Sequence, residues 1–262
     1  MKRILGFSLC VALTLTGHAA FAEDTCTKLT ITGHPQYPVI AFKDGDQIAG
    51  AAPMLVETIA KDLKIPVESK FTGTWQDAQA ATRDGKVDMI VGVYYNNDRA
   101  TYLDYVQPAF MFDQVVIFAA KDKGFAFNGQ DDLIGKKGVT NIGESYGTDF
   151  DAFIKDKLTV ARADGIHDAF KDLLSGKADY LIAGYFAGLA EASKAGVKDQ
   201  VEPLSPAILE AEMFVAFSKK SPCRSLAPKF SEGITAMTTD GRFDKILEDA
   251  TTAWDAAQQP KK

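Results

Sequence analysis

Short runs typical of β-strands alternate with amphipathic helical runs, and this alternation limits the possible folds more than any other feature. In the first third of the chain we expect strand, helix, strand, helix and strand over residues 28–33, 53–63, 67–71, 75–84 and 87–93. The last run is continuously apolar, which is typical of a strand buried on both faces of a parallel sheet. Strands alternating with helices predict an α/β fold.

A second unit of the same kind follows a loop rich in Gly and Phe at residues 124–129. Its strands and helices are expected over residues 137–141, 148–157, 159–162, 168–175 and 180–183, with two further helices within 228–257. A Gly-Lys-x-Asp turn followed by an apolar strand begins at Gly85 and again at Gly176, as two similar lobes would produce. The alternative is that each glycine merely ends a helix in a left-handed conformation, so the repeat alone does not decide.

Two apolar, β-rich stretches of similar length flank the second unit, at residues 113–120 and 211–218. If both cross between lobes, they form a two-strand hinge and make the first lobe discontinuous. We therefore expect lobe 1 to comprise residues 23–115 and 214–262, and lobe 2 to comprise residues 116–213.

The first 22 residues have the features of a secretory signal peptide. Lys2 and Arg3 precede an apolar run and a small-residue site that predicts cleavage after Ala22. The run is short for a membrane-spanning helix, which is the alternative interpretation. Export would place the mature chain in the periplasm, where its remaining cysteines, Cys26 and Cys223, are expected to form a disulfide bond.

Charge and motifs exclude several classes of function. Removal of residues 1–22 takes away two basic residues, so 29 become 27 against 35 acidic residues, a formal charge of −8. This balance argues against nucleic acid and anionic membranes as partners. The sequence has no Gly-rich phosphate motif, and His34 and His167 are far apart, so we expect neither a cofactor nor a metal site.

Motifs spread along the chain resemble those of one known family. The most specific are WQDA at Trp75, GKVDMIVG at Gly85, NDR at Asn97 and LDYVQP at Leu103. In this order they resemble the periplasmic solute-binding proteins of polar-amino-acid ABC importers, extracellular solute-binding protein family 3. The likeness continues at further motifs and spans nearly the whole mature chain: YP at Tyr37, GKKGV at Gly135, GESYG at Gly143 and TDGRFDKI at Thr239.

The resemblance implies a fold and a function. The fold would have two α/β lobes, joined by a two-strand hinge, that close over a ligand held at the ends of the strands. The function would be to carry a small polar ligand, an amino acid or an analogue, to the permease of an ABC importer in the inner membrane. The resemblance further implies a monomer.

The same resemblance implies which residues bind the ligand. Arg99 is expected to hold a ligand carboxylate through two parallel hydrogen bonds; the alternative is a solvated surface arginine paired with Asp98. Trp75 and Tyr37 are expected as aromatic walls, or else as core residues. Backbone N–H groups at the helix start near Ser145 suit a carboxylate, unless Ser145 is a plain N-cap. The expected set is His34, Tyr37, Trp75, Gly92, Tyr94, Arg99, Ser145, Tyr146 and Tyr185.

Four positions depart from the family pattern. Relatives usually carry small hydroxyl residues near Gly92 and Tyr94, and often an aspartate that binds the ligand ammonium where this chain has Gly184. His34 stands where some relatives have an aspartate. No clear replacement anion is visible besides Glu144. We therefore expect a carboxylate-bearing ligand that need not be a standard L-α-amino acid.

Two other functions stay open at the level of sequence. Some periplasmic cyclohexadienyl dehydratases share this fold, and Glu144 is a conceivable catalytic acid, although no second catalytic group supports it. A sensory module that presents its ligand to a receptor is the other possibility.

Overall fold

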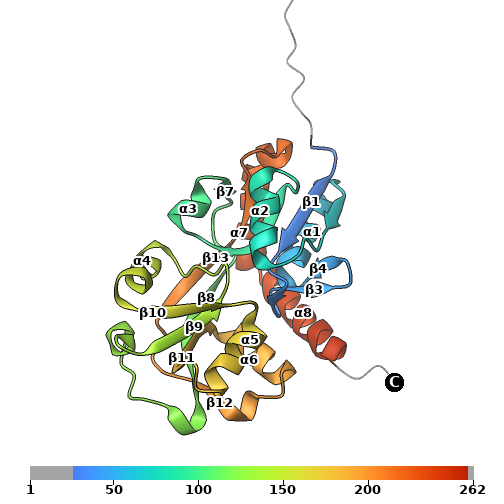
Figure 1. Cartoon of the computed structure of the whole chain (residues 1–262). Helices are drawn as coiled ribbons and strands as arrows, with labels where there is room; N and C mark the ends of the chain where they lie inside the picture. Colours follow the sequence, from blue (N-terminus) through green and yellow to red (C-terminus); the bar gives the residue numbers. More distant parts are fainter. Residues whose placement is uncertain (1–25, 259–262) are drawn as a thin grey trace, which may run out of the picture.

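The computed structural model describes residues 26–258 of the 262-residue chain. The expected signal peptide, residues 1–22, lies outside this range. One curled ten-stranded sheet runs through the molecule, in the order β10-β9-β11-β8-β13-β6-β1-β5, with β12 paired to β8 and β7 to β13. Helices pack against it in two groups, one mostly in the upper part of the view in Figure 1, with α8 reaching down at the right, and one mostly in the lower part. The chain therefore has the mixed α/β, two-lobe architecture that the alternating pattern predicts.

Lobe 1 contains one end of the sheet. Strand β1 lies between β5 and β6 and is parallel to both, as expected for consecutive βαβ units. The last two helices of the chain return to this lobe, where α8 and α7 contact α1. The elements of this lobe are β1 (Leu29–Gly33), α1 (Ala51–Asp62), β5 (Val67–Ser69), α2 (Trp75–Asp84), β6 (Met89–Tyr94), α3 (Asn97–Ala100), β7 (Leu103–Tyr105), α7 (Ala227–Thr239) and α8 (Arg242–Gln258).

Lobe 2 contains the other end of the sheet. Strand β9 lies between β10 and β11 and is parallel to both. Every residue of β11 is buried, as its continuous apolar sequence predicts. The elements are β9 (Lys137–Asn141), α4 (Thr148–Lys157), β10 (Thr159–Ala163), α5 (Ile166–Leu174), β11 (Tyr180–Gly184), α6 (Tyr185–Lys194) and β12 (Val201–Pro203), with short 3₁₀ helices at Lys121–Lys123, Gln130–Leu133 and Lys198–Gln200.

Two long antiparallel strands join the lobes. These are β8 (Met111–Ala120) and β13 (Leu209–Ser218), which pair from Met111 opposite Met213 to Val115 opposite Leu209. Beyond this shared segment β8 pairs with β11 of lobe 2, whereas β13 pairs with β6 of lobe 1. They lie between the two groups of helices in Figure 1. The expected two-strand hinge is thus present.

A small sheet covers the start of lobe 1 and was not predicted. It consists of three short antiparallel strands, β2 (Gln36–Tyr37), β3 (Ala41–Asp44) and β4 (Gln47–Ala49). Strands of two to four residues carry too few alternating positions for a sequence pattern to reveal them. This sheet places Tyr37 at the cleft.

Local sequence signals fix the ends of α2. Thr74 and Asp77 form a capping box, in which each side chain accepts a hydrogen bond from the other's backbone N–H. Gly85 ends the helix in the left-handed conformation, with φ of 75°. Because Trp75 is the first residue of α2, the capping box holds its indole at the cleft.

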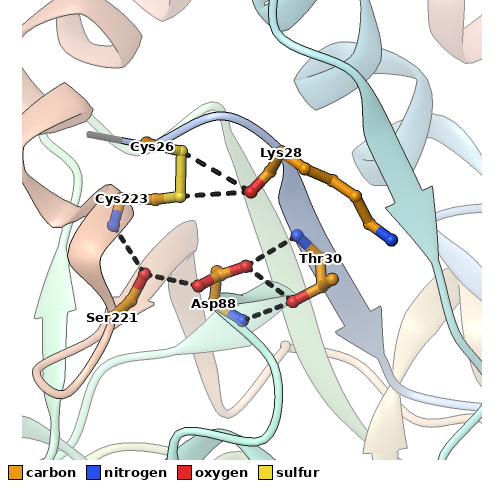
Figure 2. The surroundings of a disulfide bond; sticks show 6 residues. All are labelled: Cys26, Lys28, Thr30, Asp88, Ser221 and Cys223. Atoms are coloured by element: carbon orange, nitrogen blue, oxygen red, sulfur yellow. Dashed lines mark hydrogen bonds between the residues drawn. A yellow bond between two sulfur atoms is a disulfide. The ribbon is translucent and has the colours of Figure 1, made fainter. Parts of the chain in front are cut away.

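A disulfide bond between Cys26 and Cys223 confirms the expected pairing. Both residues belong to lobe 1, so the bond joins the start of the described chain to the 3₁₀ helix Pro222–Leu226 without crossing the hinge. Beside it, the Asp88 carboxylate accepts hydrogen bonds from the Thr30 N–H and hydroxyl and from the Ser221 hydroxyl (Figure 2). The start of the described chain, β1 and the segment that leads into α7 are therefore linked to one another.

Candidate functional site

The candidate site is a cleft between the carboxyl ends of β1 and β6 in lobe 1 and those of β9 and β11 in lobe 2. Its centre is a small cavity of about 10 Å³, close to the space that one water molecule needs. Two larger grooves, of about 590 and 490 Å³, share residues with it. The cavity is lined by His34, Gln36, Tyr37, Thr140, Asn141, Glu144, Tyr146, Ile166, Ile182, Ala183 and Gly184.

A direct polar contact closes this cleft. His34 Nε2, from lobe 1, lies 2.9 Å from Glu144 Oε1, from lobe 2. His34 Nδ1 accepts a hydrogen bond from the Gln36 backbone N–H at 2.9 Å, so the proton is on Nε2, which donates to Glu144. The two side chains are 3% and 11% exposed. The lobes are thus held together by a buried histidine–carboxylate hydrogen bond.

The environment of Glu144 favours its ionised form. Burial alone would raise the pKa of this carboxyl, but His34, the Arg99 charge and the Asn141 side chain together bring the pKa below its usual value. Asn141 Nδ2 lies 3.3 Å from the same Oε1 atom. Glu144 is therefore a carboxylate at neutral pH, and the acid form that general-acid catalysis would require is disfavoured.

Arg99 is buried at the same junction. It is 3% exposed and lies in the short helix α3, where the Asn96 side chain caps its backbone N–H. Its Nε donates to Gln79 Oε1 at 3.0 Å, Nη1 to the Tyr94 carbonyl at 3.1 Å, and Nη2 to the lobe 2 carbonyl of Gly143 at 3.2 Å. The solvated surface arginine considered above is therefore excluded. Arg99 spans the two lobes.

Trp75 forms an aromatic wall beside these charges. It is 4% exposed, its ring centroid is 4.9 Å from that of His34, and the Arg99 guanidinium lies 5.3 Å from the indole ring. The guanidinium over the ring face is a favourable cation–π contact. The indole Nε1 has no hydrogen-bond partner among residues 26–258. Trp75 also packs with core residues such as Ile90, so it serves the core and the cleft together.

Tyr37 and Tyr94 form a hydroxyl pair with a carboxylate that sequence reasoning missed. Both hydroxyls donate to Asp113 Oδ2, that of Tyr94 at 2.6 Å. Burial raises the pKa of both tyrosines well above the usual value, so both remain donors. Burial also raises the pKa of Asp113, although the two tyrosine hydrogen bonds partly offset it. Asp113 could have been suspected as the acid that begins the otherwise mostly apolar stretch 113–120.

The start of α4 is occupied by the chain itself. The Tyr146 N–H, which was expected to be free for a carboxylate, donates to Asp151 Oδ1 at 2.8 Å, and the Ser145 hydroxyl donates to Asp151 Oδ2. Ser145 Oγ also accepts a hydrogen bond from Asn96 Nδ2 of lobe 1 at 2.5 Å. Ser145 is not a plain N-cap, because Gly147 holds that position. It links the lobes instead.

Three residues of the expected set, His34, Tyr37 and Tyr146, line the central cavity, and two others lie apart from both the cavity and the contacts around it. Gly92, with φ of 69°, lies at an irregularity in the pairing of β6 with β13, and a Cβ there would face Ile40 and Ala52. Tyr185 begins α6 and packs against the core of lobe 2 and Phe186. The structure brings together the rest of the set: His34, Tyr37, Trp75, Tyr94, Arg99, Ser145 and Tyr146.

Two kinds of site are absent from residues 26–258. No group of three or more His, Cys, Asp and Glu side chains there is arranged to hold a metal ion. In the same range, no helix is both long enough and apolar enough to cross a membrane.

Two lobes, a two-strand hinge and a closed cleft between them are the architecture of the periplasmic binding proteins. The chain belongs to the bacterial extracellular solute-binding proteins, family 3, whose family model matches residues 29–252. No curated protein shows significant sequence similarity to the chain.

Solved structures with the same fold include proteins of several functions. A histidine kinase sensor domain has a TM-score of 0.71 and 22% identity, covering 85% of this chain and 95% of that one. The amino acid ABC transporter substrate-binding protein AbpA from Streptococcus pneumoniae, bound to L-arginine, has a TM-score of 0.69 and 21% identity, covering 87% and 96%. The ancestral amino-acid-binding protein AncCDT-1, a precursor of cyclohexadienyl dehydratase, has a TM-score of 0.67 and 22% identity, covering 86% and 96%. At these identities the likeness shows the fold.

Proposed function

We propose that this protein is the periplasmic substrate-binding component of an ABC importer and captures a small carboxylate-bearing ligand, an amino acid or an analogue, by closing its lobes. The observation that carries the proposal is the position of Arg99. Its guanidinium lies at the junction of the two lobes, is buried, and donates to a carbonyl oxygen of the opposite lobe. A ligand carboxylate can replace that acceptor and add a second hydrogen bond.

Binding requires the cleft to open, because its central cavity is too small for an amino acid. On opening, Arg99 loses the Gly143 carbonyl and His34 loses Glu144, so both regain donor capacity. A carboxylate that enters satisfies the Arg99 guanidinium, and Trp75 provides a flat apolar wall beside it. Reclosure then buries the ligand between the lobes, and the closed form is the one that a permease would recognise.

Family membership and structural likeness support the remaining parts of this proposal. The family is extracellular, which agrees with an exported chain. Similar structures include the substrate-binding protein of an amino acid ABC transporter and an ancestral arginine-binding protein bound to glutamine. We propose further that the mature protein is a monomer released by cleavage after Ala22, and that its partner is an inner-membrane permease.

Isothermal titration of the wild type and Arg99→Lys with the twenty standard amino acids tests the proposal. Lysine keeps the positive charge but cannot form the paired hydrogen bonds, so we expect affinity for the tightest ligand to fall by at least tenfold. Arg83→Lys, the same substitution at an exposed arginine that stacks on Tyr102 outside the cleft, is the control and should bind as the wild type does. Equal affinity of Arg99→Lys and the wild type would refute the role of Arg99.

Two other functions on this fold are distinguished by simple assays. The likeness to a dehydratase precursor makes prephenate and arogenate worth testing, but an ionised Glu144 disfavours proton donation, so we expect no turnover. The likeness to a sensor domain raises the possibility of a receptor partner. Deletion of the gene should abolish ligand uptake if the protein is a carrier, and the response to the ligand if it is a sensor.

A further inference from the structure

A buried carboxylate lies where the hinge meets the cleft. Asp113 is 2% exposed and belongs to β8, the strand that passes from lobe 1 into lobe 2. Its Oδ2 accepts hydrogen bonds from the hydroxyls of Tyr37 and Tyr94. Its Oδ1 has no hydrogen-bond partner in the part of the chain that the structure describes. A carboxylate buried so deeply is costly unless a cation or further donors compensate for the lost hydration.

A glycine, Gly184, lies beside this carboxylate at the edge of the cavity. Gly184 lines the cavity at the end of β11. A Cβ at this position would lie 1.7 Å from Tyr37 Oη and 2.7 Å from Asp113 Oδ2. Only glycine leaves room for these two groups. Because Tyr37 belongs to lobe 1 and Gly184 to lobe 2, separation of the lobes would uncover Asp113.

Glu144 is the other anion near the cavity, but its charge is already matched. It accepts a hydrogen bond from His34, lies within reach of Asn141, and is stabilised by the Arg99 charge. Asp113 has two hydroxyl donors on Oδ2, the oxygen nearest Gly184, and no hydrogen-bond partner on Oδ1 within the described part of the chain. An ammonium group, with three donors and a positive charge, matches this arrangement. The neutral hydroxyls of Tyr37 and Tyr94 orient the carboxylate without neutralising it.

We infer that Asp113, oriented by Tyr37 and Tyr94, binds a positively charged amine of the ligand in place of an acid at Gly184. This inference rests on the proposed function. The amine lies against the hinge strand, in the space that opens between Tyr37 and Gly184, while the carboxylate lies at Arg99. Because Asp113 belongs to β8, the strand about which the lobes turn, binding of the amine is coupled to lobe closure.

The test compares binding by the wild type, Asp113→Asn and the control Glu191→Gln. Each protein is titrated by calorimetry with the twenty standard amino acids, γ-aminobutyrate and glycine betaine, and with the amine-free carboxylates acetate, succinate and 2-oxoglutarate. We expect the tightest wild-type ligand to carry an amine, and Asp113→Asn to weaken its binding at least tenfold. Glu191 is also a buried acid whose pKa burial raises, but it lies on α6 outside the cavity lining, so Glu191→Gln should bind within twofold of the wild type.

The possible failures are distinguishable. If the wild type binds none of these compounds, the proposed function itself is refuted, and the inference with it. If an amine-free carboxylate binds as tightly as any amino acid, or if Asp113→Asn binds the best amine within threefold of the wild type, only the inference is overturned.

A crystal structure of the wild-type protein with its tightest amine ligand tests the same point without a variant. The inference requires the ligand nitrogen to lie within hydrogen-bond distance, about 3.2 Å, of an Asp113 oxygen. A nitrogen bound to Glu144, or exposed to solvent, would overturn it.

Discussion

At the scale of single residues, the cleft is held shut by groups that a ligand would also use. Three hydrogen bonds link lobe 1 to lobe 2: His34 to Glu144, Arg99 to the Gly143 carbonyl, and Asn96 to Ser145. Each contact satisfies a buried polar group that would otherwise be costly. These contacts favour the closed cleft, and a ligand has to offer better partners than the chain does.

The pair of His34 and Glu144 makes stability depend on pH. Since the pKa of Glu144 is lower in the folded protein than its ordinary value of 4.5, ionisation of this carboxyl favours folding. Its contribution is complete above about pH 4.5 and is lost as the pH falls through the lowered value. Glu144→Gln keeps an acceptor for His34 but removes the charge, so we expect a loss of about 1 kcal/mol near pH 7, the difference between charged and neutral hydrogen bonds.

Urea denaturation of the wild type and Glu144→Gln between pH 3 and pH 7 measures this effect. The two curves of unfolding free energy should converge as the pH falls. Glu248→Gln, at a residue that is 74% exposed on α8, should follow the wild type throughout. A constant difference between Glu144→Gln and the wild type across the whole pH range would contradict the account.

The residues of the cleft differ in how far sequence could predict them. Arg99 and Trp75 were found because they lie within motifs that resemble a family. Asp113 was missed because its importance comes from a contact with Tyr37 and with the space left at Gly184, which are distant in sequence. Asp151 was missed because its carboxylate accepts a hydrogen bond from the Tyr146 N–H, five residues earlier, and no sequence pattern indicates such a contact.

At the scale of elements, the spacing of apolar residues and the local composition predicted the long strands and helices well. The expected helices at residues 75–84 and 148–157 match α2 and α4 in full, and the strand at 137–141 matches β9. The short strands β2, β3 and β4 were missed, because they are ordered by packing, β3 and β4 on α1 and β2 on α6, rather than by a pattern of alternation. The hinge strands were recognised, although both begin two residues earlier than expected.

The disulfide bond is an element of lobe 1 whose removal should lower stability without altering binding. It closes a loop with a sequence separation of 197 residues, for which chain entropy gives an upper value of about 5 kcal/mol. We expect the double variant Cys26→Ser/Cys223→Ser to lose about 2–5 kcal/mol and to melt several degrees lower. Reductant should destabilise the wild type but leave the double variant unchanged. A double variant as stable as the wild type would contradict this, and would mean that the hydrogen bonds of Asp88 alone hold β1 against the 3₁₀ helix Pro222–Leu226.

At the scale of the whole molecule, the account depends on movement. The sheet is continuous through β8 and β13, and these are the strands about which the lobes would turn. The closed cleft has a central cavity of only about 10 Å³, so the lobes have to open before an amino acid enters and have to reclose over it slightly further apart.

The most direct test of this hinge mechanism is a distance measurement between the lobes. Spin labels at Lys86→Cys in lobe 1 and Lys171→Cys in lobe 2 replace side chains that are 73% and 64% exposed, and the native cysteines stay paired. Pulsed electron–electron double resonance should give a broad distribution of distances between the labels without ligand. It should give a single narrow distribution when the tightest-binding amino acid saturates the protein. One narrow distribution, unchanged by ligand, would contradict capture by lobe closure.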